Sequence, residues 1–421
     1  MGVALLLAVA CTPEGPQRPQ LPSVSPHPPV EVKTGPTTAL EAMRRLCIPA
    51  DIPPGSVIEV PTPPAIAEVE DQVEAVRGLA FQRPVNVEPV TPEEIDRRLR
   101  EYLDAYYPKR FYARRSDAWA TIGAIPRNVG ILQAIDAYQQ GQVLGFYDSQ
   151  NEELVYTGDA DLDRIEHFVL AHELTHAIDD QHFDLDRLDD LVMRCDDEPF
   201  QAALGIVEGS ANHYATQVLL RFPVAATGSA PGGGSASEVP PLMLEIFAYP
   251  YTAGQRFADA LADAGGQTAV DRALRRFPTT TEQILHPSKY PHDVAELVDV
   301  PDFAPTFGPR WRDHDVMVVG EVWLKALLNV RLDEPAAASA AAGWDGGIYR
   351  AWSDGDDVAV ILSTVWDTPA DATEFMGALT RWESLGSTPG LVLEADGTRV
   401  HAGFASDDAL MDALSSALRS L

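Results

Sequence analysis

The segment LAHELTH, residues 170–176, decides how the rest of the chain is interpreted, and it lies inside a helix predicted over 163–180. His172 and His176 are four residues apart, so a helix places both imidazoles on one face, one turn apart. Two neutral nitrogen ligands in this arrangement suit a Zn²⁺ ion. Glu173 lies beside that face, where it can act as a general base toward a metal-bound water and return the proton to a leaving amine.

The alternative is a purely structural interpretation, in which the segment is a helix with two half-buried histidines of the core. Ile165 and Val169 share the face of His172 and His176, as core residues would. A chance HExxH in a chain of this composition is rare, so we favour the metal site.

The third metal ligand has two candidates. Glu208 follows His176 by 32 residues on the next predicted helix, 199–220, which would aim it at the same ion if the two helices pack antiparallel. His182 follows His176 by six residues, although Asp179 occupies the position where a three-histidine motif has glycine. We favour Glu208.

Other polar residues are candidates for supporting roles. Asn212 or Asp179 could orient a metal-binding histidine through its second ring nitrogen. Attack on a carbonyl group by a metal-activated water would also need a donor that stabilises the developing oxyanion. The candidates for that donor are His213, Tyr147, Tyr214, His286 and Tyr290, of which we select His286, in the polar run TTTEQILHPSKY.

The charge of the chain excludes several classes of partner. Lys and Arg number 31 and Asp and Glu number 63, which gives a formal net charge of −32. Such a surface repels nucleic-acid phosphates and anionic lipid headgroups. After the first 11 residues, no stretch of the sequence approaches the roughly 18 consecutive apolar residues that a membrane span needs. We expect no nucleic-acid partner, and the sequence assigns no oligomeric state.

The N-terminus suggests export. An apolar run ends at Cys11, as in a bacterial lipoprotein signal, and a Pro-rich tether over 12–36 follows it. We therefore expect a protein of the cell envelope, lipid-anchored at Cys11 to the outer face of the cytoplasmic membrane. Cys47 and Cys195 are either a disulfide, which an exported compartment permits, or two separate buried thiols.

The pattern of helices and strands predicts an α+β fold. The last 80 residues alternate as ββα-ββα, whereas a helix is predicted over 116–140 and another over 312–331. The predicted units are a signal at 1–11, a tether at 12–36, an N-terminal catalytic half at 37–222, a flexible loop at 223–241, a helical C-terminal half at 242–340 and a small α+β unit at 341–421.

Five blocks of the chain carry a resemblance to a known family. They are GFYD (145–148), LAHELTHAIDDQHFDL (170–185), ALGIVEGSAN (203–212), TEQILHP (281–287) and GWDG (343–346). The chain resembles the gluzincin-type zinc metallopeptidases, which include thermolysin, and more closely a poorly characterised group of bacterial exported neutral zinc metallopeptidases.

The resemblance implies a zincin-like catalytic core, with His172, His176 and Glu208 as zinc ligands and Glu173 as general base. It also implies that a strand at 142–148 borders the cleft and pairs with an extended peptide. The expected activity is that of a zinc-dependent endopeptidase, with a peptide or protein as substrate. The alternative is a non-catalytic metal-binding envelope lipoprotein that acts as a binding or assembly module.

Overall fold

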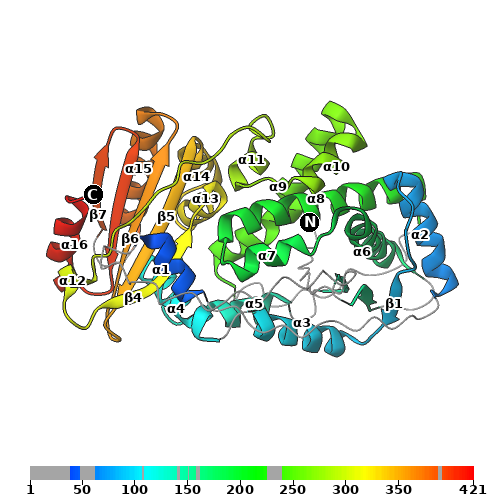
Figure 1. Ribbon diagram of the computed structural model, residues 1–421, viewed down its shortest axis with the longest axis horizontal. Coiled ribbons are helices and arrows are strands. Elements are labelled where there is room, and N and C mark those ends of the chain that lie inside the picture. Colours follow the sequence, from blue (N-terminus) through cyan, green and yellow to red (C-terminus); the bar gives the residue numbers. More distant parts are fainter. Residues whose placement is uncertain are drawn as a thin grey trace, which may run out of the picture.

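The computed structural model describes residues 38–47, 62–106, 109–139, 143–149, 151–157, 162–224, 239–386 and 391–421. The fold is α+β, as predicted, with two sheets at opposite ends of a helical body (Figure 1). The predicted signal at 1–11, the tether at 12–36 and all but the ends of the loop at 223–241 lie outside the described residues.

The small sheet has three strands in the order β1-β3-β2, and it packs against the helix that carries HExxH. The strands are β1 (Asn86–Pro89), β2 (Gly145–Asp148) and β3 (Glu153–Tyr156). β1 pairs with β3 in parallel, and β2 pairs with β3 antiparallel as the expected hairpin. Tyr147 and Leu154 are paired in register and pack in one apolar cluster with Leu170 and Leu174.

In the described residues before β2, the chain forms five helices. They are α1 (Ala39–Leu46), α2 (Pro64–Arg77), α3 (Pro92–Tyr106), α4 (Lys109–Ile122) and α5 (Ile131–Gln139). The prediction of one helix over 116–140 is wrong, because α4 ends at Ile122 and α5 begins only at Ile131. Gly123 adopts a φ of 88°, a conformation that favours glycine, and Pro126 follows it.

The centre of the molecule is helical. Its helices are α6 (Arg164–Phe183), α7 (Arg187–Met193), α8 (Asp197–Arg221), α9 (Pro241–Gly265), α10 (Gln267–Arg275) and α11 (Thr281–Leu285). α6 begins at Asp163, whose side chain accepts hydrogen bonds from the backbone of Ile165 and Glu166. α8 and α9 cross closely at Gly209, where a Cβ atom would lie 2.2 Å from the carbonyl oxygen of Gly254.

The C-terminal part contains a five-stranded antiparallel sheet in the order β4-β5-β6-β8-β7. Its elements are α12 (Ala304–Phe307), β4 (Arg312–Val318), α13 (Glu321–Asn329), α14 (Glu334–Ala341), β5 (Trp344–Ser353), β6 (Val358–Trp366), α15 (Pro369–Ser384), β7 (Leu391–Asp396), β8 (Arg399–Ala405), the 3₁₀ turn η2 (Asp408–Leu410) and α16 (Met411–Leu418). The predicted ββα-ββα order is confirmed.

The prediction of a helix over 312–331 is wrong in its first part, which is strand β4. β4 pairs with β5 along its length, and its Asp315 is buried against Arg115 of α4. The predicted α+β unit at 341–421 leaves out β4, although β4 belongs to the same sheet. The sheet therefore begins at Arg312, earlier in the chain than predicted.

Cys47 and Cys195 form a disulfide, with their Cα atoms 5.9 Å apart. The bond joins the end of α1 to the turn between α7 and α8, while α1 itself packs against β4. The interpretation as a disulfide is thereby confirmed over that of separate thiols. In the part of the chain that the structure covers, no helix is both long enough and apolar enough to cross a membrane.

Candidate metal centre

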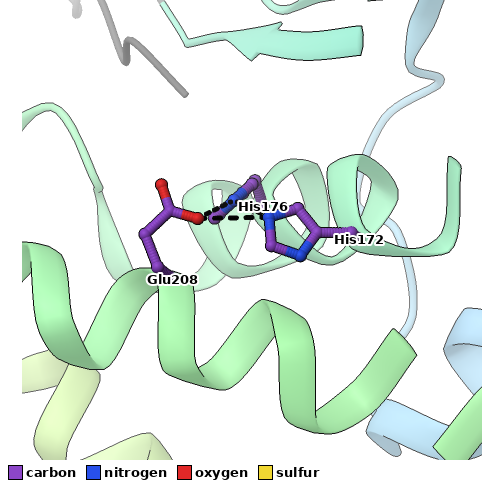
Figure 2. A group of neighbouring side chains, drawn as sticks. All are labelled: His172, His176 and Glu208. Atoms are coloured by element: carbon purple, nitrogen blue, oxygen red, sulfur yellow. Dashed lines mark hydrogen bonds and ion pairs between the residues drawn. The ribbon is translucent and has the colours of Figure 1, made fainter. Parts of the chain in front are cut away.

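Two packed helices bring His172, His176 and Glu208 together (Figure 2). α6 carries both histidines on one face, and α8 carries Glu208. The two Nε2 atoms are 3.0 Å apart. Glu208 Oε2 lies 3.1 Å from His172 Nε2 and 3.4 Å from His176 Nε2. Three potential ligand atoms from two helices therefore converge on one point.

The spacing of these atoms fits a zinc ion. A tetrahedral site with bonds of about 2.0–2.1 Å places neighbouring ligand atoms about 3.3 Å apart. The observed separations of 3.0, 3.1 and 3.4 Å bracket that value. Each of the three side chains has an exposed fraction of 1% or less. Two imidazoles and one carboxylate form a donor set typical of a catalytic zinc site with an open fourth position.

Glu173 is fully buried beside the three converging side chains, and neither of its carboxylate oxygens has a hydrogen-bond partner among the described residues. Burial raises its pKa to about 8, against the lowering effect of His172, while the charge of Glu208 raises it further. The backbone amide of Tyr147 in β2 lies near enough to lower this pKa, although it makes no hydrogen bond to either oxygen. Burial thus favours the neutral form of the Glu173 carboxyl group, whereas a cation nearby would favour its charged form.

The negative charges of Glu208 and Asp179 are stabilised by different partners. Burial opposes ionisation of Glu208, but His176 and His172 outweigh it and hold its pKa below the ordinary value. Asp179 is instead paired with Arg77 at 2.7 Å. Imidazoles bind a metal only when neutral, so a cation at the point of convergence would supply the charge that Glu208 needs.

His182, the alternative third ligand, does not join the cluster. α6 continues as an uninterrupted helix to Phe183, so His182 lies on a different face of the helix from His172 and His176. Its Nε2 atom lies 2.8 Å from the carbonyl oxygen of Ala80, and its Nδ1 atom lies 3.2 Å from Gln82. Between the two candidates, the geometry selects Glu208.

Asn212 does not orient a metal-binding histidine, so that prediction is wrong. Its Nδ2 atom donates to the backbone carbonyl of Tyr251 in α9 at 3.1 Å. Asp179, the competing candidate, lies one turn after His176 on α6 and interacts with it electrostatically. Its carboxylate accepts a hydrogen bond from Ser210 at 3.0 Å.

The five candidates for oxyanion stabilisation have partners away from the three converging side chains. These contacts are Tyr147 with Asp180 at 3.0 Å, His213 with Asp259 at 2.6 Å, Tyr214 with Arg77 at 3.4 Å, Tyr290 with the carbonyl of Arg276 at 2.7 Å, and His286 with Glu321 at 2.9 Å. The role assigned to His286 stays a prediction, and its observed contact gives that role no support.

Two residues near the three converging side chains could not be predicted from the local sequence. Tyr251 of α9 has its ring centroid 6.2 Å from that of His172, although it follows HExxH by 75 residues and belongs to no motif. Arg77 ends α2, a position where an arginine is ordinary on any exposed helix, yet it is fully buried. Only the packing of distant helices reveals either residue.

Comparison with known proteins gives one match. The family model described as "Domain of unknown function (DUF8575)" matches residues 309–410, which is the five-stranded sheet with α13, α14 and α15. The match lies outside the helices that carry the three converging side chains. No curated protein and no solved structure matches the chain significantly.

Proposed function

We propose that the protein is a zinc-dependent endopeptidase, with His172, His176 and Glu208 as metal ligands and Glu173 as general base. The observation that carries this proposal is the state of Glu173. It is a fully buried carboxyl group, neither of its oxygens has a hydrogen-bond partner among the described residues, and the charges of His172 and Glu208 act on it. A purely structural metal site gains nothing from such a group, which costs free energy to bury.

The roles of the residues follow from their chemistry. When bound, zinc supplies Lewis-acid polarisation of the peptide carbonyl and acidifies a water molecule. Glu173 accepts the proton of the water whose oxygen attacks the carbonyl carbon. The same carboxyl group then returns that proton to the amide nitrogen as the C–N bond breaks, which yields a carboxylic acid and an amine.

The edge of the small sheet is the proposed place for the substrate backbone. β2 lies at the edge of the sheet, and its Tyr147 amide lies close to Glu173. An edge strand offers backbone donors and acceptors to an extended peptide whatever its side chains. We therefore expect broad sequence preference.

The test is cleavage of unfolded casein by the zinc-loaded chain and by its Glu173→Gln variant, which is nearly isosteric. We expect cleavage by the wild type to fall by about 10²–10⁴-fold in the variant, because general acid–base catalysis contributes that much. Zinc content, measured by atomic absorption, should stay equal in the two proteins. Cleavage that survives in Glu173→Gln, or in zinc-free protein, would refute this mechanism.

A second candidate function, a non-catalytic metal-binding module, is favoured by one observation. His172, His176, Glu173 and Glu208 are all at most 1% exposed, so a substrate must displace part of the structure to reach them. This candidate predicts zinc in both proteins of the same experiment and cleavage by neither.

We also propose export and lipid anchoring at Cys11, on the N-terminal sequence alone. Expression of the wild type and of Cys11→Ala in a bacterial host that lipidates proteins tests this point. We expect a fatty-acid label on the wild type only and release of the variant from the membrane fraction.

A further inference from the structure

Arg77 connects four helices from a fully buried position at the end of α2. Its Nε atom donates to Asp179 Oδ1 in α6 at 2.7 Å, and its Nη2 atom lies 2.7 Å from Asp271 Oδ1 in α10. Its guanidinium also stacks over the ring of Tyr214 in α8, 4.6 Å from the centroid. One planar cation thus fixes α2, α6, α8 and α10 relative to one another.

Asp179 connects this cation to the metal centre. Its Oδ1 atom faces Arg77, and its Oδ2 atom accepts from Ser210 Oγ in α8 at 3.0 Å. Asp179 lies one helical turn after His176, and Ser210 lies two residues after Glu208. Both contacts are therefore within one turn of a potential metal ligand.

The two contacts between α6 and α8 oppose rotation of either helix. Glu208 and Ser210 are about 200° apart around α8, at about 100° per residue. Glu208 therefore contacts the histidines from one side of α8, and Ser210 contacts Asp179 from the opposite side of the same helix. A rotation of α8 that keeps one of these hydrogen bonds breaks the other.

The end of α2 is shaped to bring Arg77 into this position. Gly78 ends the helix with a φ of 67°, and a Cβ atom there would lie 2.5 Å from Gln267 Oε1 at the start of α10. The left-handed φ of Gly78 favours glycine and ends α2 directly after Arg77, next to the start of α10.

We propose that Arg77, Asp179 and Ser210 are positioning residues of the metal centre, which hold His176 and Glu208 in the geometry that binds the ion. This inference rests on the proposed metal site. It assigns helix α2 a part in metal binding although α2 supplies no ligand.

The test measures metal affinity rather than activity, in the full chain. Zinc affinity is obtained by competition with a fluorescent chelator, and the geometry of the site by the visible absorption spectrum of the Co²⁺-loaded protein. We expect Ser210→Ala, Asp179→Asn and Arg77→Lys each to weaken zinc binding by about 10–100-fold, the range for residues that orient ligands. Arg77→Lys belongs here because lysine lacks the planar fork that holds two carboxylates at once.

Arg187 offers a matched control. Its Nη2 atom donates to the carbonyls of Phe183 and Leu274, and its guanidinium stacks over Phe277, so it joins α6 to α10 without touching the cluster. Arg187→Met should lower thermal stability and leave zinc affinity within about twofold of the wild type, since it removes no group near a ligand.

Ser210→Ala decides the question if Asp179→Asn fails to fold, because it removes only a hydroxyl group. Wild-type zinc affinity and an unchanged Co²⁺ spectrum in folded Ser210→Ala would overturn the proposal. A wild type that binds no zinc would overturn both this proposal and the proposed function. A wild type that binds zinc but cleaves nothing refutes the peptidase alone, and the affinities then decide this inference.

Discussion

Two buried glutamates show how differently the same side chain is used in this fold. Glu173 has no hydrogen-bond partner for either oxygen among the residues described, whereas Glu198 at the start of α8 accepts from the Thr281 hydroxyl at 2.9 Å and from the Thr281 backbone amide. Burial raises the pKa of Glu198 to about 7 in spite of those donors, and the charges of Glu321 and Glu282 add to the rise. The first is the proposed general base, and the second anchors the start of α8 to Thr281 of α11.

Glu198 leads to a prediction about pH. Its pKa is raised on folding from 4.5 to about 7, so between these values the folded chain holds a proton that the unfolded chain has lost. The free energy of unfolding therefore falls as the pH rises from about 4.5 to about 7, by up to about 3 kcal/mol for this group. Glu198→Gln should flatten that fall, measured by urea denaturation at pH 5 and pH 8. Equal pH dependence in both proteins would show that Glu198 titrates normally.

At the scale of elements, α8 is the helix on which the site depends. It contacts α6 through Glu208 and Ser210, and it crosses α9 at Gly209 with no room for a side chain. The proposed metal centre thus sits beside a close approach of two helix backbones, which limits how far α8 can shift.

Gly209→Ala tests the importance of this crossing. A methyl group would lie 2.2 Å from the carbonyl oxygen of Gly254, so one helix must move. We expect a loss of about 1–3 kcal/mol in the free energy of unfolding, the usual cost of overpacking. Gly377→Ala in α15 is the control: it has open space around it, so alanine should add about 0.5–1 kcal/mol. Thermal unfolding of the two variants beside the wild type makes the comparison, and equal effects would contradict it.

Local patterns predicted the part of the site that one helix carries. The i, i+4 spacing of His172 and His176 requires only that α6 be helical, and the Asp163 cap makes it so. The third member, Glu208, depended on the packing of two helices, which the sequence left open against His182. Arg77 could not be found at all, because its role arises from contacts with residues about 100 or more positions away.

Strand β4 shows why one element was assigned wrongly. The sequence RDHDVMV contains both charged and apolar residues in an order that neither helical nor strand periodicity explains well. Asp315 is buried there only because Arg115 of α4 and Tyr349 of β5 hold its carboxylate. Tertiary pairing, and not local preference, makes this segment a strand.

At the scale of the whole molecule, the disulfide closes a loop of 148 residues that contains α2 to α7 and the small sheet. Such a loop restricts the unfolded chain strongly. We expect Cys47→Ala with Cys195→Ala to lower the free energy of unfolding by about 2–5 kcal/mol, measured by guanidinium denaturation. Dithiothreitol should destabilise the wild type by the same amount and leave the double variant unchanged. A wild type that is insensitive to the reductant would show that the bond does not stabilise the fold.

The disulfide also determines the route that mechanical tension takes through the protein. A pull on the N-terminal end of α1, as from an anchored chain, passes along α1 to Cys47 and crosses the sulfur–sulfur bond to Cys195, directly before α8. The residues between the two cysteines, α6 with its two histidines among them, lie off this covalent path. The covalent path therefore leads tension into α1 and the start of α8 and bypasses the backbone of the HExxH helix, which such a pull would reach only through packing contacts such as those with α8.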